Sequence, residues 1–171
     1  MTGWGIGGPS RSRVLRGGAL ALGVEAVASP VVEVSTDKAG AMADPSIAGN
    51  IGAGILKRYI VTLDYNHTTM YLKPVTIPVD DLDTFDRAGL WINQAADGFV
   101  VVDVTKGAPA EQAGLKAGDV IVAVDGKPAK DLKLYELRKR LRNEMSGTVV
   151  TFRIRRASKT QDVAVTLRNL I

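Results

Sequence analysis

The chain has 171 residues, of which 46% are hydrophobic and 23% are charged, and its formal net charge is +4 at pH 7. This composition is typical of a globular protein with one good core or two small ones, and it excludes disordered and fibrous proteins. The chain has no cysteine and a single histidine, His67, which excludes disulfides, thiol nucleophiles and thiolate zinc sites. Any catalysis would have to use carboxylates, hydroxyls or lysines.

The longest weakly polar stretch runs from residue 17 to residue 32, and Glu25 and Pro30 interrupt it. A membrane-spanning helix needs about 20 consecutive apolar residues, so we expect no membrane span. The arginines before this stretch are typical of the charged region of a signal peptide, but Glu25 and the glycine-rich start argue against that interpretation. The compartment stays open, and a periplasmic or secreted location of a full-length parent is compatible with the sequence.

Short apolar runs separated by glycine fill residues 1–78, a pattern that predicts strands. Two such runs with a polar turn between them predict a β-hairpin over residues 58–72, preceded by a short helix near residues 54–57. The glycines in AGNIGAGILKR (48–58) have the order Gly-x-x-Gly-x-Gly. A P-loop and a dinucleotide fold need other spacings, and no hydroxyl residue follows Lys57, so we expect no phosphate site.

A proline and several acids in TIPVDDLDTFD (76–86) predict a linker, which divides the chain into domains at residues 1–78 and 79–171. The second domain shows, in chain order, a β-branched strand at 98–104, a short helix within 107–119, a strand and turn at 119–129, an amphipathic helix at 131–142 and two alternating strands. On the longer helix, Leu134, Leu137 and Leu141 share the apolar face. The fold class that follows is mainly β with short helices.

Two basic clusters, at residues 138–142 and 153–156, alternate with apolar residues, and no aromatic stacking platform for bases accompanies them. They are expected to form a solvated face, so we expect no nucleic-acid binding. No serine has the glycine-flanked setting that exposes a nucleophile, which argues against a Ser/Lys peptidase. We expect neither a metal site nor a cofactor.

Three features of the second domain resemble a PDZ domain. They are the loop and strand RAGLWI (87–92), the segment APAEQAGLKAGDVIVAVDG (108–126) and the helix LYELRKRL (134–141). The middle segment is the most specific, and the resemblance covers residues 82–170. It implies a domain of about five strands and two helices that binds peptides or protein C-termini by strand addition.

The glycine loop before the strand at residues 90–94 also predicts a carboxylate site on physical grounds. Because glycine leaves consecutive backbone N–H groups unobstructed, the amides of Ala88, Gly89 and Leu90 would bind a ligand's terminal carboxylate. Arg87 would add a positive charge. The resemblance implies that Leu90, Ile92 and residues of the facing helix line an apolar pocket, so we expect an apolar last residue in the ligand.

The complete set of candidate peptide-binding residues is Arg87, Ala88, Gly89, Leu90, Trp91, Ile92, Leu137, Arg138 and Leu141. For the helical leucines, an alternative interpretation as plain core residues stays open. The loop departs from the family's usual Gly-Leu-Gly-Phe, because only the second glycine is present. The groove helix also lacks the histidine that defines ligand classes in the family, so those classes do not carry over.

Residues 1–78 resemble a second family. The stretches SPVVEVSTDKAG (29–40), DPSIAGNIGAGILKRYIVTLDY (44–65) and TMYLKP (69–74) look like the later part of a retropepsin-like aspartyl protease, of the bacterial kind that carries a C-terminal PDZ domain. This resemblance implies a partial β-barrel. An aspartyl protease needs an Asp-Thr-Gly or Asp-Ser-Gly loop so that two carboxylates share a proton, and neither tripeptide occurs here. We therefore expect no catalytic residue in this chain.

Two functions are compatible with these patterns. The first is a peptide-binding PDZ module attached to a catalytically incomplete aspartyl-protease-like fragment. The alternative is the C-terminal portion of an active aspartic endopeptidase whose catalytic aspartate lies upstream of Met1. In both cases this chain alone is expected to be inactive. A homodimer through the protease-like part is also expected, because half of a barrel leaves sheet edges exposed.

Overall fold

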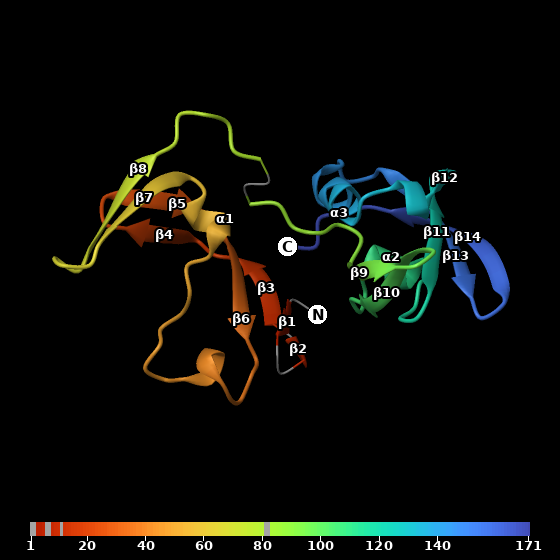
Figure 1. Ribbon diagram of the computed structural model, residues 1–171, viewed down its shortest axis with the longest axis horizontal. Coiled ribbons are helices and arrows are strands. Elements are labelled where there is room, and N and C mark those ends of the chain that lie inside the picture. Colours follow the sequence, from red (N-terminus) through yellow and green to blue (C-terminus); the bar gives the residue numbers. More distant parts are fainter. Residues whose placement is uncertain (1–2, 6–7, 11, 81–82) are drawn as a thin grey trace. The chain divides into compact units, whose positions relative to one another are not determined.

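The computed structural model divides into two units, one formed by residues 10–83 and the other by the remaining residues (Figure 1). It describes residues 3–5, 8–10, 12–80 and 83–171. Residues 81–82 of the expected linker lie outside the described residues, as do five positions near the start of the expected protease-like domain. Among the described residues, none of the helices has the length and apolar character needed to span a membrane.

An antiparallel sheet forms the body of the second unit. Its strands lie in the order β14-β13-β11-β10-β9, and the short β12 (Lys127–Pro128) pairs with β11. The five ordered strands are β9 (Leu90–Ala95), β10 (Gly98–Val104), β11 (Val120–Val124), β13 (Val149–Arg156) and β14 (Lys159–Thr166). Because β9 is the last strand in this order, one of its sides has no partner strand within the part of the chain that the structure describes.

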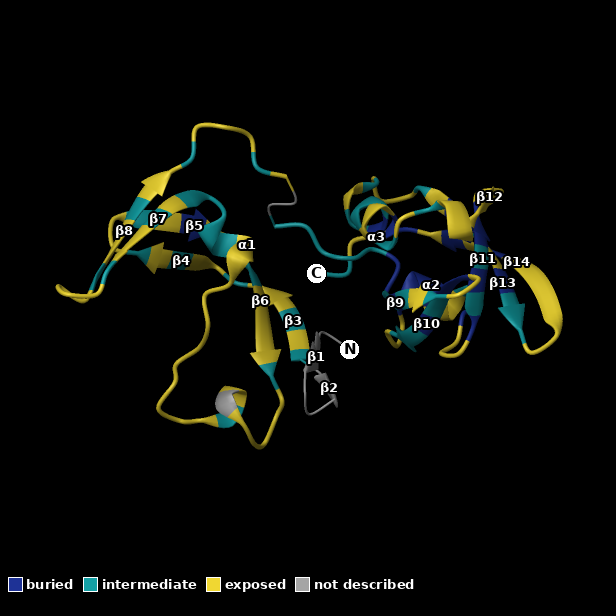
Figure 2. Cartoon of the chain, viewed as in Figure 1, coloured by how far each residue is buried: buried dark blue, intermediate teal, exposed yellow. Residues whose placement is uncertain are grey.

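The core of this unit follows from the alternation of apolar and polar residues in the strands. In β13, Val150, Phe152 and Ile154 are buried while Arg153 is exposed, since successive side chains of a strand point to opposite faces. Buried positions in the other strands and in the helices complete one cluster, which includes Ile92, Phe99, Val101, Ile121, Leu137, Leu141, Val165 and Leu167. Figure 2 shows this concentration of buried residues in the second unit.

The helices of this unit are short and close to their expected positions. They are α2 (Pro109–Gln112), the 3-10 helix η2 (Ala129–Asp131) and α3 (Leu134–Asn143). Pro109 occupies the first turn of α2, where its missing N–H costs nothing, and Gly114 has a φ of +91° just after the helix. The leucines Leu137 and Leu141 of α3 are buried against the sheet, so the predicted amphipathic helix is confirmed.

The unit of residues 10–83 consists of separate two-stranded sheets. The pairs are β3 (Ser12–Arg16) with β6 (Val31–Ser35), β4 (Ala19–Leu22) with β5 (Glu25–Ala28), and β7 (Tyr59–Asp64) with β8 (Thr69–Pro74). Two short helices, η1 (Ala41–Ala43) and α1 (Ala53–Leu56), lie between β6 and β7. The predicted hairpin over residues 58–72 and the short helix before it are therefore confirmed. A further pair, β1 (Gly3–Gly5) with β2 (Gly8–Ser10), precedes β3.

In place of the partial β-barrel expected in residues 1–78, the described residues form separate two-stranded sheets. Of the residues in the unit 10–83 whose burial the structure describes, only Val27 and Pro30 are buried, and large apolar side chains such as Leu15, Ile60 and Leu63 are exposed. Each of its sheets contains only two strands, so few side chains can be covered from both sides. The broader prediction of a mainly β chain with short helices is confirmed.

Candidate functional site

The open side of β9 carries unpaired backbone groups. Val101 of β10 lies opposite Ile92, and it uses both its N–H and its C=O on the side of β11, in hydrogen bonds to Asp119 and Gly118 of 2.8 Å each. Backbone groups alternate in direction along an antiparallel strand, so the N–H and C=O of Ile92 point away from β10. We call this open side of Leu90–Ala95 the β9 edge, and it can pair with an additional strand.

Helix α3 places one arginine against the β9 edge. Nη2 of Arg138 donates hydrogen bonds to the carbonyl oxygen of Ile92 at 2.6 Å and to Oδ1 of Asn93 at 3.2 Å. The guanidinium group also lies over the ring of Trp91, 5.4 Å from its centroid, at a distance typical of a cation–π contact. Arg138 thus satisfies the outward carbonyl of β9 that an added strand would otherwise use.

The loop that enters β9 is held by the residues before and within α2. The carbonyl of Ala88 accepts a hydrogen bond from the N–H of Ala110, and the carbonyl of Gly89 accepts one from the N–H of Thr105, at 2.9 Å each. Gly89 has a φ of +77°, a backbone conformation that favours glycine. The amides of this loop therefore have a fixed direction at the start of β9.

The carboxylate of Asp86 is bound by the amides of the same loop. Its Oδ2 accepts a hydrogen bond from the N–H of Leu90 at 3.1 Å and a second one from the N–H of Gly89. Burial raises the pKa of Asp86 to about 6, although the hydrogen bonds from the loop amides and the charge of Arg142 act to lower it. The sequence indicates Asp86 only as one of several acids in a linker, so its contact with the loop amides was not predicted.

The raised pKa of Asp86 predicts a pH-dependent stability. Its folded pKa lies above that of the unfolded chain, so the folded state binds the proton more tightly and stability falls as pH rises through about 6. Between about pH 7.5 and about pH 5, we expect the free energy of unfolding to rise by about 1.4 kcal/mol through this group. Urea unfolding of the wild type and of Asp86→Asn at both pH values measures the effect, which should be absent in the variant. An equal pH dependence in both proteins would contradict the assignment.

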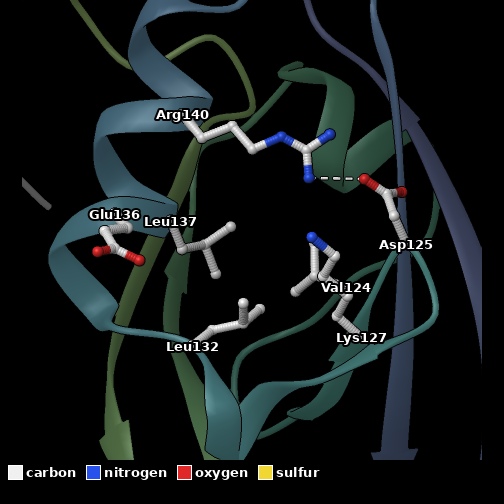
Figure 3. Close-up of a pocket in the computed structure, with 7 residues that line it drawn as sticks. All are labelled: Val124, Asp125, Lys127, Leu132, Glu136, Leu137 and Arg140. Carbon is white, nitrogen blue, oxygen red and sulfur yellow. Dashed lines mark ion pairs between the residues drawn. The ribbon is translucent and has the colours of Figure 1, made fainter.

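A separate cavity lies on the other side of α3, towards β11 and β12. It has a volume of about 420 Å³ and is lined by Val124, Asp125, Lys127, Leu132, Glu136, Leu137 and Arg140. Figure 3 shows apolar side chains on its floor and the ion pair between Arg140 Nη1 and Asp125 Oδ2, at 2.6 Å, across one side. Among the residues described, no group of three or more acids and histidines is placed to hold a metal ion.

The profile of the PDZ domain matches residues 77–167. The chain belongs to the PDZ domain family. We refer to residues 84–171 as the PDZ unit. In this family the unit is a peptide-binding module, and the resemblance noted in the sequence for this half of the chain is confirmed.

Several proteins that are similar to the chain carry the names of proteases. A "Probable periplasmic serine endoprotease DegP-like" of Chlamydia trachomatis serovar D is 44% identical over 73 residues, which are 43% of this chain and 14% of the relative. A "Probable CtpA-like serine protease" of Staphylococcus aureus strain COL is 36% identical over 81 residues, or 47% of this chain and 16% of the relative. Among solved structures, the photosystem II D1 C-terminal processing protease is 32% identical, with a TM-score of 0.45, over 50% of this chain and 24% of that one. The chain thus spans only a small part of these proteins.

These comparisons correct the interpretation of residues 1–78. The curated relatives named above carry the names of serine proteases, so the resemblance to retropepsin-like aspartyl proteases is not supported. A PDZ unit binds an extended chain through backbone groups and supplies no nucleophile. It can therefore accompany proteases of different mechanisms, and its presence does not indicate which catalytic residues a protease uses.

The structure brings most of the candidate peptide-binding residues to the β9 edge and to α3. Within the PDZ unit, Ala88, Gly89, Ile92, Leu137 and Leu141 are buried, Arg87, Leu90 and Trp91 are partly buried, and Arg138 is exposed. The core cluster includes Ile92, Leu137 and Leu141, and Leu137 also lines the separate cavity. The guanidinium of Arg87 donates a hydrogen bond to the carbonyl of Glu144, after the end of α3. It is thus engaged away from the loop amides.

Proposed function

We propose that the PDZ unit binds an extended peptide segment as an added antiparallel strand on the β9 edge. The observation that carries this proposal is the outward direction of the backbone groups of Ile92, next to α3. Leu90 and Leu134 are partly buried and pack on the core cluster, so they offer apolar contacts to alternate side chains of the ligand. The names of the relatives support a role in proteolysis, in which the unit holds a substrate or a regulatory segment for a protease.

Self-association through the residues before the PDZ unit stays part of this proposal. The exposed apolar side chains of β3, β6, β7 and β8, among them Leu15, Val34, Ile60 and Leu63, support it. A second copy of the chain would cover such side chains and the open sides of the two-stranded sheets.

Strand addition makes a specific prediction about the ligand backbone. In an added strand, every second N–H points at the β9 edge, so methylation of those nitrogens removes a hydrogen bond and adds a steric clash. We expect N-methylation at one set of alternate positions to weaken binding by about tenfold or more, and at the other set to change it little.

The measurement uses the full chain with Trp4→Phe, which leaves Trp91 in β9 as the only tryptophan and a fluorescence reporter. A synthetic array of hexapeptide amides with valine, leucine, isoleucine, phenylalanine or alanine at alternate positions provides the ligands. The tightest binder is then remade with single N-methyl groups along its backbone. Equal losses at every position, or an array without any binder, would refute strand addition.

A further inference from the structure

The amides expected to bind a ligand's terminal carboxylate already bind a carboxylate of the chain itself. The N–H groups of Gly89 and Leu90 both donate to Oδ2 of Asp86, and this carboxylate has the same chemistry as the end of a peptide. Building on the function proposed above, we infer that Asp86 competes with a ligand's terminal carboxylate for these amides. The β9 edge therefore favours capped or internal extended segments over free C-termini.

Simultaneous binding of the two carboxylates at this loop is strongly opposed. Two ionised carboxylates that share one set of donors repel each other, so either one leaves or one is protonated. Among the described residues, the arginines near the loop are already engaged elsewhere or with Asp86. Arg87 donates to the carbonyl of Glu144, and Arg168 donates to the carbonyl of Gly107. Arg142 of α3 acts on Asp86 itself.

The charged groups packed around Asp86 come from several elements. Arg142 belongs to the end of α3, Glu144 follows that helix, Arg168 follows β14, and Glu111 of α2 accepts a hydrogen bond from the N–H of Gly107 at 2.6 Å. Of these groups, Arg142 alone contributes to the pKa of Asp86, and it favours the ionised form. The charge at the loop therefore depends on the protonation of Asp86.

An internal peptide segment has to displace only Arg138 from the β9 edge, and Arg138 is easier to displace than Asp86. The segment needs the carbonyl of Ile92, which Arg138 occupies, and Arg138 is an exposed side chain on α3 that can turn into solvent. A free C-terminus must also displace Asp86, which is partly buried and held by two backbone amides. Binding of a free C-terminus therefore costs more free energy than binding of an internal segment, and the displacement of Asp86 accounts for the difference.

A lower pH should reduce the preference of the β9 edge for capped or internal segments over free C-termini. Burial raises the pKa of Asp86 to about 6, so at about pH 5 most of the carboxyl is neutral and competes less for the amides. A peptide's own terminal carboxylate has a pKa of about 3.5 and stays ionised there. If binding of a free C-terminus requires the protonated form, its affinity rises by up to about 30-fold between about pH 7.5 and about pH 5. An amidated peptide lacks this dependence.

The test uses the peptide array described above, synthesised as matched pairs of free acids and amides. The full chain is measured as wild type, as Asp86→Asn and as Asp97→Asn, at about pH 7.5 and about pH 5. Asp97→Asn is the matched control, because Asp97 lies past the far end of β9 and its exposed carboxylate pairs with Arg155. In the wild type at the higher pH, we expect the acids to bind about tenfold more weakly than their amides. In Asp86→Asn the affinity for the free acids should rise about tenfold and no longer depend on pH. Asp97→Asn should behave as the wild type.

The outcomes separate this inference from the function on which it rests. Acids that bind more tightly than amides to the wild type at the higher pH overturn the competition while strand addition stands. An unchanged acid-to-amide ratio in Asp86→Asn overturns it as well. If that variant does not fold, the pH series on the wild type decides alone, since a flat ratio contradicts the inference. If neither the free acids nor the amides bind the wild type or either variant, strand addition itself is refuted.

Discussion

Replacement of Arg156 by methionine is expected to lower the free energy of unfolding by about 3 kcal/mol, because it leaves Asp119 as an unpaired buried charge. Asp119 is only 1% exposed, and its carboxylate accepts hydrogen bonds from Nε and Nη2 of Arg156 at 2.6 and 2.7 Å. A third bond comes from the N–H of Lys116 at 2.8 Å. The methionine keeps the bulk of the side chain, so the loss reports on the polar contacts of the guanidinium group, which also donates to the carbonyl oxygen of Gly114 at 2.7 Å.

The same strand offers a matched control. Arg153 of β13 also pairs with an aspartate, Asp162, at 2.8 Å, but both side chains are about half exposed. Arg153→Met should change the free energy of unfolding by no more than about 0.5 kcal/mol, since exposed ion pairs contribute little. Urea unfolding at neutral pH compares the two variants. Losses of equal size would show that burial of Asp119 does not decide the effect.

The pH dependence gives a second readout of the Arg156 variant. Burial acts to raise the pKa of Asp119, but the bonds from Arg156 and Lys116 outweigh it and hold that pKa below its usual range. Its contribution to stability is therefore present above the unfolded pKa and disappears as pH falls through the lower folded value. Without Arg156 the pKa should rise, and the difference between variant and wild type should shrink in acid.

Gly89→Ala is expected to cost about 2–4 kcal/mol and to abolish peptide binding. A Cβ at Gly89 would lie 2.2 Å from Cβ of Ala108 and 3.3 Å from Cβ of Thr105, so the loop has to move. The φ of +77° adds strain for any residue with a side chain. Both effects shift the amides that bind Asp86.

Gly107 provides the control for Gly89, because its φ is +74° and no atom lies within 4 Å of an added Cβ. Gly107→Ala should cost only about 1 kcal/mol, the strain of a left-handed residue, and should leave peptide binding unchanged. Thermal unfolding and the tryptophan fluorescence assay measure the two variants side by side. Equal stability of the two alanine variants would contradict the steric argument.

The sheet of the PDZ unit was predictable from local pattern. The alternation in β13 and β14 and the apolar face of α3 already assign Phe152, Val165 and Leu141 to the interior. The loop at Gly89 was also predictable, because a glycine before a strand exposes its amides. In residues 10–83 the pattern indicated strands correctly, but closure of a barrel depends on pairing between distant segments, which local periodicity does not encode.

The contacts of two residues at the site, Asp86 and Arg138, were not predictable in the same way. Asp86 reads as one acid among several in a linker, and only the backbone conformation at Gly89 brings two amides to its carboxylate. Arg138 is among the candidate peptide-binding residues, but the sequence does not indicate which atom of β9 it contacts. Its contact with Ile92 depends on the register of β9, which includes an irregularity between Val101 and Asp103 of β10. Long-range geometry of this kind leaves no mark on sequence spacing.

The arginine at the β9 edge also bears on how two copies of the chain meet. An open strand edge tends to pair with another open edge, and side-by-side pairing of two β9 strands would build a continuous sheet across two molecules. Because the guanidinium of Arg138 lies on that edge, such pairing would bring two like charges together and force both to give up their bonds to Ile92. The same side chain that a peptide has to displace thus protects the PDZ unit from sheet-forming aggregation.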